Sequence, residues 1–564
     1  MRDEDIISAV QPAGAPTRRT PTRRWLLAQS AFLVLTLALF ALATWQVHAT
    51  ERQVVREEIT ISDAGGNISA LRFTPRDEHL NIVAVVAHGY SGSKEVMTTF
   101  CIELAKQGIT AYCFDFPGHG SSPETFNTDA ALSGAQSQLT NTVGAVVDYA
   151  LQNMPRRDAK LVLIGHSMGT AAVGLYALRH PELANLAATV LVSPVLDEAP
   201  TTNNPRNLLV LAGDADPAGI IRIAKMRVAE GCGQPSDGAL SADLTCGDPR
   251  LGTGRKLVIL PGLNHITILT ASATHRQILD WLSAGLDAGI TTDTVTADQR
   301  FLWLLLGLGA AFLALLPALA LASAGLRQLP TRRAESAAGN AYLRSLTALS
   351  VMIAALVMGM IALHFFVDSP FGFLLQALSP DLATFLFGAG IVALGLALAV
   401  PACRSEADWP RGLSIATQAA LAVGAFVFLY FTLGALSTFA WASLALTPAR
   451  MWRALALALL FIPLFLGSEL LLRPVARAKP WLAAGTKLTV ALLTTVALFA
   501  AILIDANRLS FLLFLLPIMA IFLLLFVALE TWTRREVERP LVFIALTEAL
   551  ILGWAVAATF PLLG

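Results

Sequence analysis

The stretch KLVLIGHSMGTAAVGLY, which covers residues 160–176, decides the fold. It reads as an apolar strand, then the pattern Gly-x-Ser-x-Gly at residues 165–169, then a helix. Between a strand and a helix, the pattern forms a sharp turn with the serine hydroxyl at its tip. A Gly-x-Ser-x-Gly pattern that arose by chance would lack the flanking strand and helix. The start of the helix also favours negative charge that develops beside it. Ser167 is therefore predicted to be a nucleophile.

Apolar runs continue on both sides of this stretch. Strands are predicted at 54–62, 68–74, 82–87, 109–114, 161–164, 188–192, 208–212 and 256–260, and helices at 95–107, 132–153, 168–180, 217–230 and 266–287. From residue 82 onward the strands are apolar on both faces, as in a sheet covered by helices on both sides. Two leading strands followed by strand–helix alternation predict a mostly parallel, doubly wound sheet. We expect the chemistry at the carboxyl ends of its strands, where such sheets bind ligands.

A serine hydroxyl is a weak nucleophile at neutral pH, so it needs a base, and the base needs an orienting acid. The histidines that follow Ser167 are at positions 180, 265, 275 and 364. Only His265 comes directly after a predicted strand, whereas the others end a helix, lie inside a helix, or fall in an apolar span. The expected chain order is serine, acid, histidine. These positions select His265 as the base.

Two carboxylates compete for the role of the acid. The strand at 208–212 leads into Gly-Asp-Ala-Asp-Pro at 213–217. Asp216 lies further beyond the strand end and just before a helix, where it can turn toward His265. Asp214 would more naturally shape the turn through hydrogen bonds to its own backbone. Asp216 is the predicted acid, with Asp214 as the alternative.

An oxyanion hole needs two N–H donors fixed where negative charge develops. One is expected from Met168, the residue after the nucleophile. The other is expected from Tyr90, in the sequence His-Gly-Tyr-Ser-Gly at 88–92 after the third strand. The alternative is that His88 and Gly89 only make a tight turn.

Five motifs in this order resemble the α/β-hydrolase superfamily, particularly its monoacylglycerol lipase-like and serine aminopeptidase-like branch. They are HGY at 88–90, DFPGHGSS at 115–122, GHSMG at 165–169, GDAD at 213–216 and GLNH at 262–265. The resemblance covers about residues 54–287. It implies the α/β-hydrolase fold, places the family's Gly-x-x-Asp acid on Asp216, and makes 115–122 a structural turn. The lipase-like members insert a long cap before the acid strand, whereas here only about 15 residues, 193–207, fill that gap.

The composition points to a membrane protein. Of the 564 residues, 55% are hydrophobic and only 14% are charged, against about 25% charged in soluble domains. The net charge of +0 gives no electrostatic case for nucleic acid. Apolar runs long enough to span a bilayer as helices lie at 25–47, 301–323, 345–367, 382–402, 413–435, 453–472, 481–503, 509–529 and 541–561.

These runs divide the chain into a cytoplasmic disordered tail at 1–24, a transmembrane anchor at 25–47, an exported hydrolase domain at 51–290, and a domain of about eight further spans at 301–564. The stretch 436–452 is apolar enough to be a re-entrant or interfacial piece. Arginines before the first span place the N-terminus inside under the positive-inside rule. The hydrolase domain and the C-terminus are then outside. The first span could instead be a cleaved, twin-arginine-like signal.

Basic residues support this orientation. The loops assigned to the inside contain Arg327, Arg332, Arg333, Arg344, Arg404, Arg411, Arg473, Arg477, Lys479, Arg534, Arg535 and Arg539, and the outer loops contain Arg450, Arg453 and Arg508. Arginine outnumbers lysine, and both alanine and leucine are abundant. This composition suggests a bacterial genome, and hence the bacterial inner membrane. Export permits disulfides. Cys232 and Cys246 share one loop and are expected to pair, whereas Cys101 and Cys113 are as readily buried free thiols.

Ionisable residues inside apolar spans are costly, and by default they suggest function. Glu469, Lys487 and Glu548 qualify, with His364 nearer a span end. Structural pairing competes with a transport or substrate role for them. The sequence predicts a membrane-anchored serine hydrolase that needs no cofactor or metal, acts on a small acyl or lipid-like substrate next to membrane lipid, and cleaves ester-type bonds ahead of peptide bonds. The alternatives are a transporter or flippase-like protein whose hydrolase domain processes or senses cargo, and a non-catalytic scaffold.

Overall fold

The architecture is known from a computed structural model, which describes residues 21–63, 65–77, 79–127, 132–235, 243–286, 288–293, 295, 298–326, 340–400, 413–510, 512–536 and 540–564. Most of the tail predicted at 1–24 lies outside these residues. So do the predicted inside arginines at 327, 332, 333, 404, 411 and 539, and the side chain of Arg535.

One nine-stranded sheet forms the centre of the N-terminal half. Its strands are β1 Val54–Asp63, β2 Gly66–Pro75, β3 Ile82–Ala87, β4 Thr110–Phe114, β5 Lys160–His166, β6 Leu186–Val192, β7 Leu208–Gly213, β8 Thr245–Cys246 and β9 Arg255–Leu260. The spatial order is β1-β2-β4-β3-β5-β6-β7-β9-β8. Pairing is parallel from β4 through β9, whereas β1, β2 and β8 join antiparallel. The predicted α/β-hydrolase fold is confirmed, and the sequence missed only the two-residue β8.

Helices cover both faces of this sheet. They are α2 Thr98–Lys106, α3 Leu132–Gln152, α4 Met168–Arg179, α5 Ala218–Gly231 and α6 Ser272–Leu286. The inner residues of β3 to β7 are fully buried, because their side chains alternate between two apolar cores, one on each face. This double burial is the physical reason for the unbroken apolar strands in the sequence.

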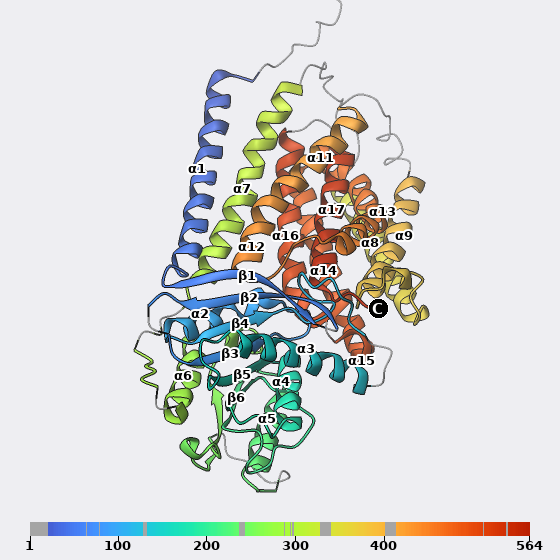
Figure 1. The fold of residues 1–564 in the computed structure, drawn as a ribbon. Coiled ribbons are helices and arrows are strands. Elements are labelled where there is room, and N and C mark those ends of the chain that lie inside the picture. Colours follow the sequence, from blue (N-terminus) through green and yellow to red (C-terminus); the bar gives the residue numbers. More distant parts are fainter. Residues whose placement is uncertain are drawn as a thin grey trace, which may run out of the picture.

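Long helices and two short ones form a bundle beside the sheet (Figure 1). They are α1 Arg23–Ala49, α7 Arg300–Leu326, α8 Ala341–Phe365, α9 Ser379–Ala399, α11 Ile415–Leu429, α12 Ala435–Ala440, α13 Pro448–Ala478, α14 Pro480–Ile504, α15 Ala506–Leu509, α16 Leu512–Glu536 and α17 Leu541–Thr559. Within the described residues, eight helical segments are long and apolar enough to cross a membrane. The ninth predicted span, 509–529, falls on α16. It is not among these eight, and several of its side chains lie outside the described residues.

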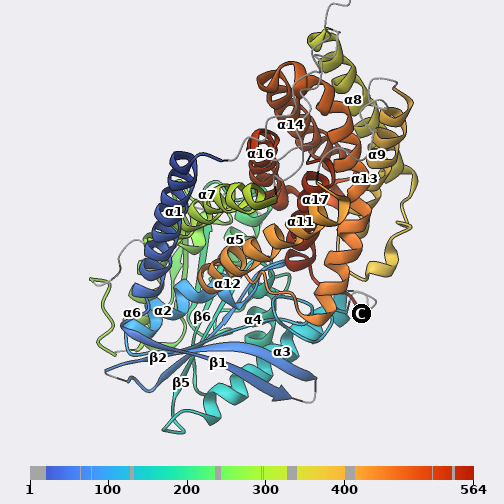
Figure 2. The same cartoon turned by 90° about the horizontal axis from the view of Figure 1, so that it is seen from above.

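The direction of the first and last helices bears on the number of crossings. We call the bundle ends next to the sheet the hydrolase side and the opposite ends the far side. The helix α1 starts on the far side and leads into β1, whereas α17 ends against the sheet domain (Figures 1 and 2). An odd number of single crossings is needed to connect these ends. The eight candidate spans together with α16 are compatible with such an odd number.

The stretch 436–452 completes one span and begins another. A π-helical turn at Tyr430–Gly434 joins α11 to α12, and residues 441–447 then run without regular structure to α13. In that connection the backbone N–H of Ser443 donates to the Ser93 hydroxyl at 3.2 Å. The segment therefore runs along the hydrolase domain.

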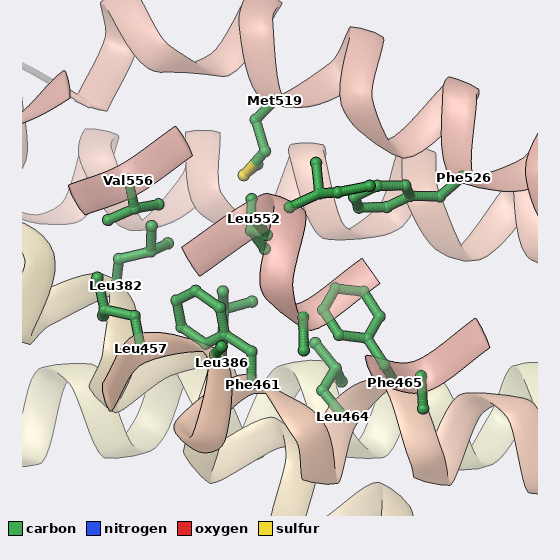
Figure 3. Packing of buried hydrophobic residues seen from close by; sticks show 14 of the residues in the cluster. Leu382, Leu386, Leu457, Phe461, Leu464, Phe465, Met519, Phe526, Leu552 and Val556 are labelled. Carbon is green, nitrogen blue, oxygen red and sulfur yellow. The ribbon is translucent and has the colours of Figure 1, made fainter. Parts of the chain in front are cut away.

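Apolar side chains fill the inside of the bundle. Figure 3 shows Leu386, Phe461, Phe465, Phe526 and Leu552 converging from several helices. The helices α13 and α17 pack closely, because an added Cβ at Gly553 would lie only 2.7 Å from the Ala454 carbonyl oxygen. Small residues permit this close approach of two helices.

Two disulfides close local loops in the sheet domain. Cys232 pairs with Cys246, as expected, with 6.0 Å between their Cα atoms. Cys101 on α2 also pairs with Cys113 on β4, at 6.6 Å. The sequence left the second pair open because a helix–strand distance across the layer cannot be read from spacing.

Candidate active site

Ser167 lies at the turn between β5 and α4. Its backbone has φ of 52°, in the left-handed region that non-glycine residues rarely adopt. The flanking glycines are required because a side chain at Gly165 would overlap the backbone of Gly169, and one at Gly169 would overlap the carbonyl of Ala87. The turn thus holds the hydroxyl beyond the end of the sheet, as the Gly-x-Ser-x-Gly pattern predicts.

The structure brings Ser167, His265 and Asp216 together. His265 Nε2 lies 3.0 Å from Ser167 Oγ, and His265 Nδ1 lies 2.8 Å from Asp216 Oδ1. His265 and Asp216 are buried, whereas Ser167 is partly exposed. Since the ionised carboxylate only accepts hydrogen bonds, Nδ1 carries the proton in neutral His265 and Nε2 is free to accept the serine proton.

Asp216 has two further donors. Its Oδ2 accepts hydrogen bonds from the Gly213 backbone N–H and from the Ser193 hydroxyl, both at 2.8 Å. Burial raises the pKa of the Asp216 carboxyl, but the hydrogen bonds from His265, Gly213 and Ser193 outweigh it, so the pKa lies below its ordinary value. The carboxylate is therefore ionised at neutral pH and can stabilise a positively charged imidazole.

The alternative acid, Asp214, lies elsewhere. Its Oδ1 accepts the backbone N–H of Gly262 at 2.7 Å, so the side chain joins the turn after β7 to the turn after β9. This shapes the loop that carries His265 and leaves contact with the imidazole to Asp216.

Two neighbours of the site were missed in the sequence. Ser193 directly follows β6, and its φ of 50° turns its hydroxyl toward Asp216. His166 precedes the nucleophile, and its Nε2–H donates to the His265 backbone carbonyl at 3.0 Å. Burial lowers the pKa of His166 to about 3, so this ring is neutral and acts as a positional support. His166 ends β5 and Ser193 follows β6, and this position at strand ends beside the site was the available signal.

The loop after β3 approaches Ser167 closely. A Cβ added to Gly89 would lie 2.9 Å from the Ser167 Cβ. His88 Nδ1–H donates to the Gly89 carbonyl at 2.7 Å, and the Gly92 N–H donates to the same oxygen at 2.9 Å. The carbonyl and N–H of a trans peptide point in opposite directions. These bonds therefore fix the direction of the Tyr90 N–H.

Met168, the second predicted donor, is the first residue of α4. N–H groups in the first turn of a helix have no acceptor within that helix. Met168 directly follows Ser167 at the start of α4, and Tyr90 lies in the loop whose Gly89 approaches Ser167. Burial raises the pKa of the Tyr90 phenol to about 12, so this neighbouring hydroxyl is neutral.

The helical bundle holds the turn predicted at 115–122. Arg450 on α13 is fully buried and donates to the carbonyls of Gly118 and Gly120 at 2.8 and 3.1 Å. It also donates to the carbonyls of Ala557 and Phe560 at the end of α17. One guanidinium thereby joins two membrane-type helices to the hydrolase domain.

The same turn contacts the loop after β3. Asp115 Oδ1 accepts the Lys94 backbone N–H, and its Oδ2 accepts Lys94 Nζ, both at 2.7 Å. His88 Nε2 accepts the Phe116 backbone N–H at 3.1 Å. Contacts therefore run from Arg450 through the 115–122 turn to the loop that carries Tyr90.

Comparisons with known proteins agree with the resemblance seen in the sequence. Residues 78–217 match the family described as serine aminopeptidase, S33. Solved structures that share the fold include a CIB-like hydrolase from Thermoplasma acidophilum, with 18% identity, a TM-score of 0.30, and coverage of 41% of this chain and 98% of that one. An α/β serine hydrolase without lid from Xanthomonas campestris has 19% identity, a TM-score of 0.29, and coverage of 42% and 95%.

An esterase from the archaeon Pyrobaculum calidifontis has 16% identity, a TM-score of 0.31, and coverage of 46% of this chain and 93% of its own. No curated protein matches the chain. The sheet order and the family match together define a domain with the α/β-hydrolase fold. The chain combines this domain with a helical region whose long apolar helices are compatible with an integral membrane protein.

Proposed function

We propose that this protein is a membrane-anchored serine hydrolase in which Ser167 is the nucleophile, His265 the base and Asp216 the orienting acid. The observation that carries the proposal is the continuous chain of hydrogen bonds from Ser167 Oγ through His265 to Asp216, with distances of 3.0 and 2.8 Å. This is the geometry by which serine hydrolases activate their hydroxyl.

The reaction then follows in two steps. His265 Nε2 takes the proton as Ser167 Oγ attacks the carbonyl carbon, and the N–H groups of Tyr90 and Met168 stabilise the oxyanion. His265⁺ returns the proton to the leaving group, which leaves an acyl group on Ser167. Water, deprotonated by the same imidazole, hydrolyses the acyl-enzyme. Asp216 stabilises His265⁺ in both steps.

The bond that is cleaved is also part of the proposal. We propose a carboxylester or thioester, with an amide as the less favoured substrate. Only residues 193–207 connect β6 to β7, so no cap of the lipase kind shapes a pocket for an acyl chain. The domain is attached to the bundle through Arg450 and Ser443, which supports a lipid-like substrate drawn from the bilayer next to the site.

The hydrolase domain is proposed to lie outside the cytoplasm. Two disulfides support an oxidising compartment. Arg23, Arg24, Arg344, Arg477 and Lys479 lie at far-side helix ends, which the positive-inside rule assigns to the cytoplasm. The bacterial inner membrane is the proposed location.

A fluorophosphonate activity probe on the full-length protein tests the proposal. We expect covalent labelling of the unchanged protein and none of Ser167→Ala. Thr170→Ser is a matched control, because it keeps the hydroxyl that accepts the Val195 N–H one turn into α4. Equal labelling of the unchanged protein and of Ser167→Ala, or labelling of neither, would refute the proposal.

A second candidate keeps the same hydrolase but gives the bundle a transport role. Buried charged residues between α13, α14, α16 and α17 favour it, because a helical anchor needs none. Flux of a labelled ester or its product across proteoliposomes would separate this candidate from a tethered hydrolase.

A further inference from the structure

A cluster of five charged side chains lies inside the helical bundle. It consists of Glu469 on α13, Lys487 on α14, Glu530 and Arg534 on α16, and Glu548 on α17. The three glutamates and Lys487 are buried among the helices, and Arg534 is partly exposed. We call these five residues the charge cluster. Among the described residues, no hydrogen bond or ion pair joins the cluster to Ser167, His265 or Asp216, and proton binding there does not depend on the proposed reaction.

The ion pairs of the cluster centre on Glu530. Lys487 Nζ lies 2.9 Å from Glu530 Oε2 and 3.1 Å from Glu548 Oε2. Arg534 Nη2 lies 2.6 Å from both Glu530 Oε1 and Glu469 Oε2. Glu530 is thus paired through both oxygens, whereas Glu469 and Glu548 are each paired through only one.

The charges of the cluster do not balance. Three carboxylates face two cations, so the fully ionised cluster carries one negative charge. Arg473 also lies on α13 and has an interaction of its own, and it is not among the ion pairs that join the described residues of the cluster. An uncompensated charge buried away from water costs many kcal/mol, and such groups neutralise instead. Among the described side chains, this imbalance is relieved by one bound positive charge.

Two oxygen atoms are left for that charge. Glu469 Oε1 and Glu548 Oε1 are buried and have no hydrogen-bond partner within the described structure. Their residues are 1% and 0% exposed, so solvent does not supply the missing partner. An ionised carboxylate oxygen at such a position is expensive, whereas a protonated carboxyl there restores the balance of charge.

We propose that the charge cluster binds one exchangeable proton, carried by Glu469 or Glu548. A metal ion fits less well, because Lys487 and Arg534 already occupy the space between the carboxylates and repel a further cation. No group suited to a metal occurs within the described residues. The membrane domain thereby contains a proton-binding site that the hydrolase reaction does not use.

The route of proton exchange follows from the direction of the helices. Phe465, Phe526 and Leu552 lie one turn toward the hydrolase side of Glu469, Glu530 and Glu548, respectively. Figure 3 shows these three residues within the apolar core, which closes the cluster on that side. The far side is more open, since a cavity of about 60 Å³ there is lined by Pro480, Ala483, Glu530, Thr531 and Arg534. The proton therefore exchanges with the far side.

Infrared spectroscopy of the full-length protein in lipid nanodiscs tests the proposal. We expect the carbonyl band of one buried, protonated carboxyl at neutral pH, shifted after exchange into D₂O. Charge balance predicts that Glu469→Gln and Glu548→Gln each abolish the band, because two carboxylates then face two cations. Asp381→Asn is the matched control, because Asp381 pairs with Arg508 at the hydrolase side, and it should keep the band.

If a glutamine variant folds poorly, the pH dependence of the melting temperature provides a second test. The melting temperature of the unchanged protein should fall as pH rises, because loss of the proton leaves the buried negative charge. Glu548→Gln should flatten this dependence, and fluorophosphonate labelling of Ser167 would report whether the hydrolase domain is intact. Absence of the band in the unchanged protein, or its persistence in both glutamine variants, would overturn the proposal.

Discussion

Ser193→Ala tests whether the residue missed in the sequence supports the catalytic acid. The hydroxyl is one of three donors to Asp216, and the residue is fully buried. A hydrogen bond to a charged group contributes about 1.5–3 kcal/mol. We expect the free energy of unfolding at neutral pH to fall by about that amount. The carboxylate keeps its hydrogen bonds from His265 and Gly213. The rate of fluorophosphonate labelling should therefore fall by less than about tenfold, which corresponds to about 1.4 kcal/mol.

The pH dependence distinguishes this bond from simple packing. The pKa of folded Asp216 lies below its ordinary value. The stability from its ionised form is therefore present above an ordinary pKa of about 4 and lost as pH falls. Without the hydroxyl the folded pKa moves back up. The stability difference between the two proteins should be largest at neutral pH and shrink on acidification.

Ser193→Gly is the matched control. It removes the same hydroxyl, but glycine adopts a φ of 50° without strain. It should recover about 1–2 kcal/mol relative to alanine and show the same change of stability with pH. The stability of both variants is measured by thermal unfolding of the detergent-solubilised protein, from pH 7 down to the lowest pH at which the protein stays folded. An alanine variant as stable as the unchanged protein at pH 7, or a difference that is independent of pH, would refute the reasoning.

Three further changes test other parts of the site. Asp216→Asn would present an amide N–H to His265 Nδ1 and favour the wrong tautomer of the imidazole. The value of kcat should therefore fall by a factor of about 10⁴. A burst assay with a chromogenic ester measures this loss, and a loss below tenfold would contradict the prediction. Gly89→Ala would crowd Ser167, so labelling should slow while the melting temperature changes little. Arg450→Met would leave the Gly120 carbonyl without its donor, at a cost of about 1–3 kcal/mol. It should slow labelling as well as lower the melting temperature, and unchanged labelling would exclude coupling between the bundle and the site.

The fold and the three central residues followed from local signals. Ser167, Asp216 and His265 each come just after a strand, and parallel strands bring their carboxyl ends to one edge. Ser193 and His166 occupy similar positions, but their contribution depends on side-chain direction, which strand order does not give. The spacing of residues within one chain could predict which turns meet, but not which hydroxyl or ring fills the space between them.

Long-range pairing in the bundle was beyond the sequence. Glu469, Lys487 and Glu548 stood out because charges are rare in apolar runs. Glu530 and Arg534 did not, because they lie near the end of α16, where charged residues normally meet water. Their role depends on α13, α14 and α17 packing around that end. Likewise, Arg450 reads as an ordinary loop arginine until the turn at 118–120 is placed against it.

The order of synthesis gives the Arg450 contacts a further meaning. The hydrolase domain is translated before α13 and α17, and domains generally begin to fold as they emerge. Its turn at 118–120 is nevertheless held by hydrogen bonds from Arg450 and from the Leu562 N–H, which donates to the Gly118 carbonyl. Both donors come from the last quarter of the chain. The site thus stays unfinished during most of translation. A protein whose final helices fail to insert would keep its three reacting side chains yet lack the support of the loop beside them, so hydrolysis would begin only after the bundle is assembled.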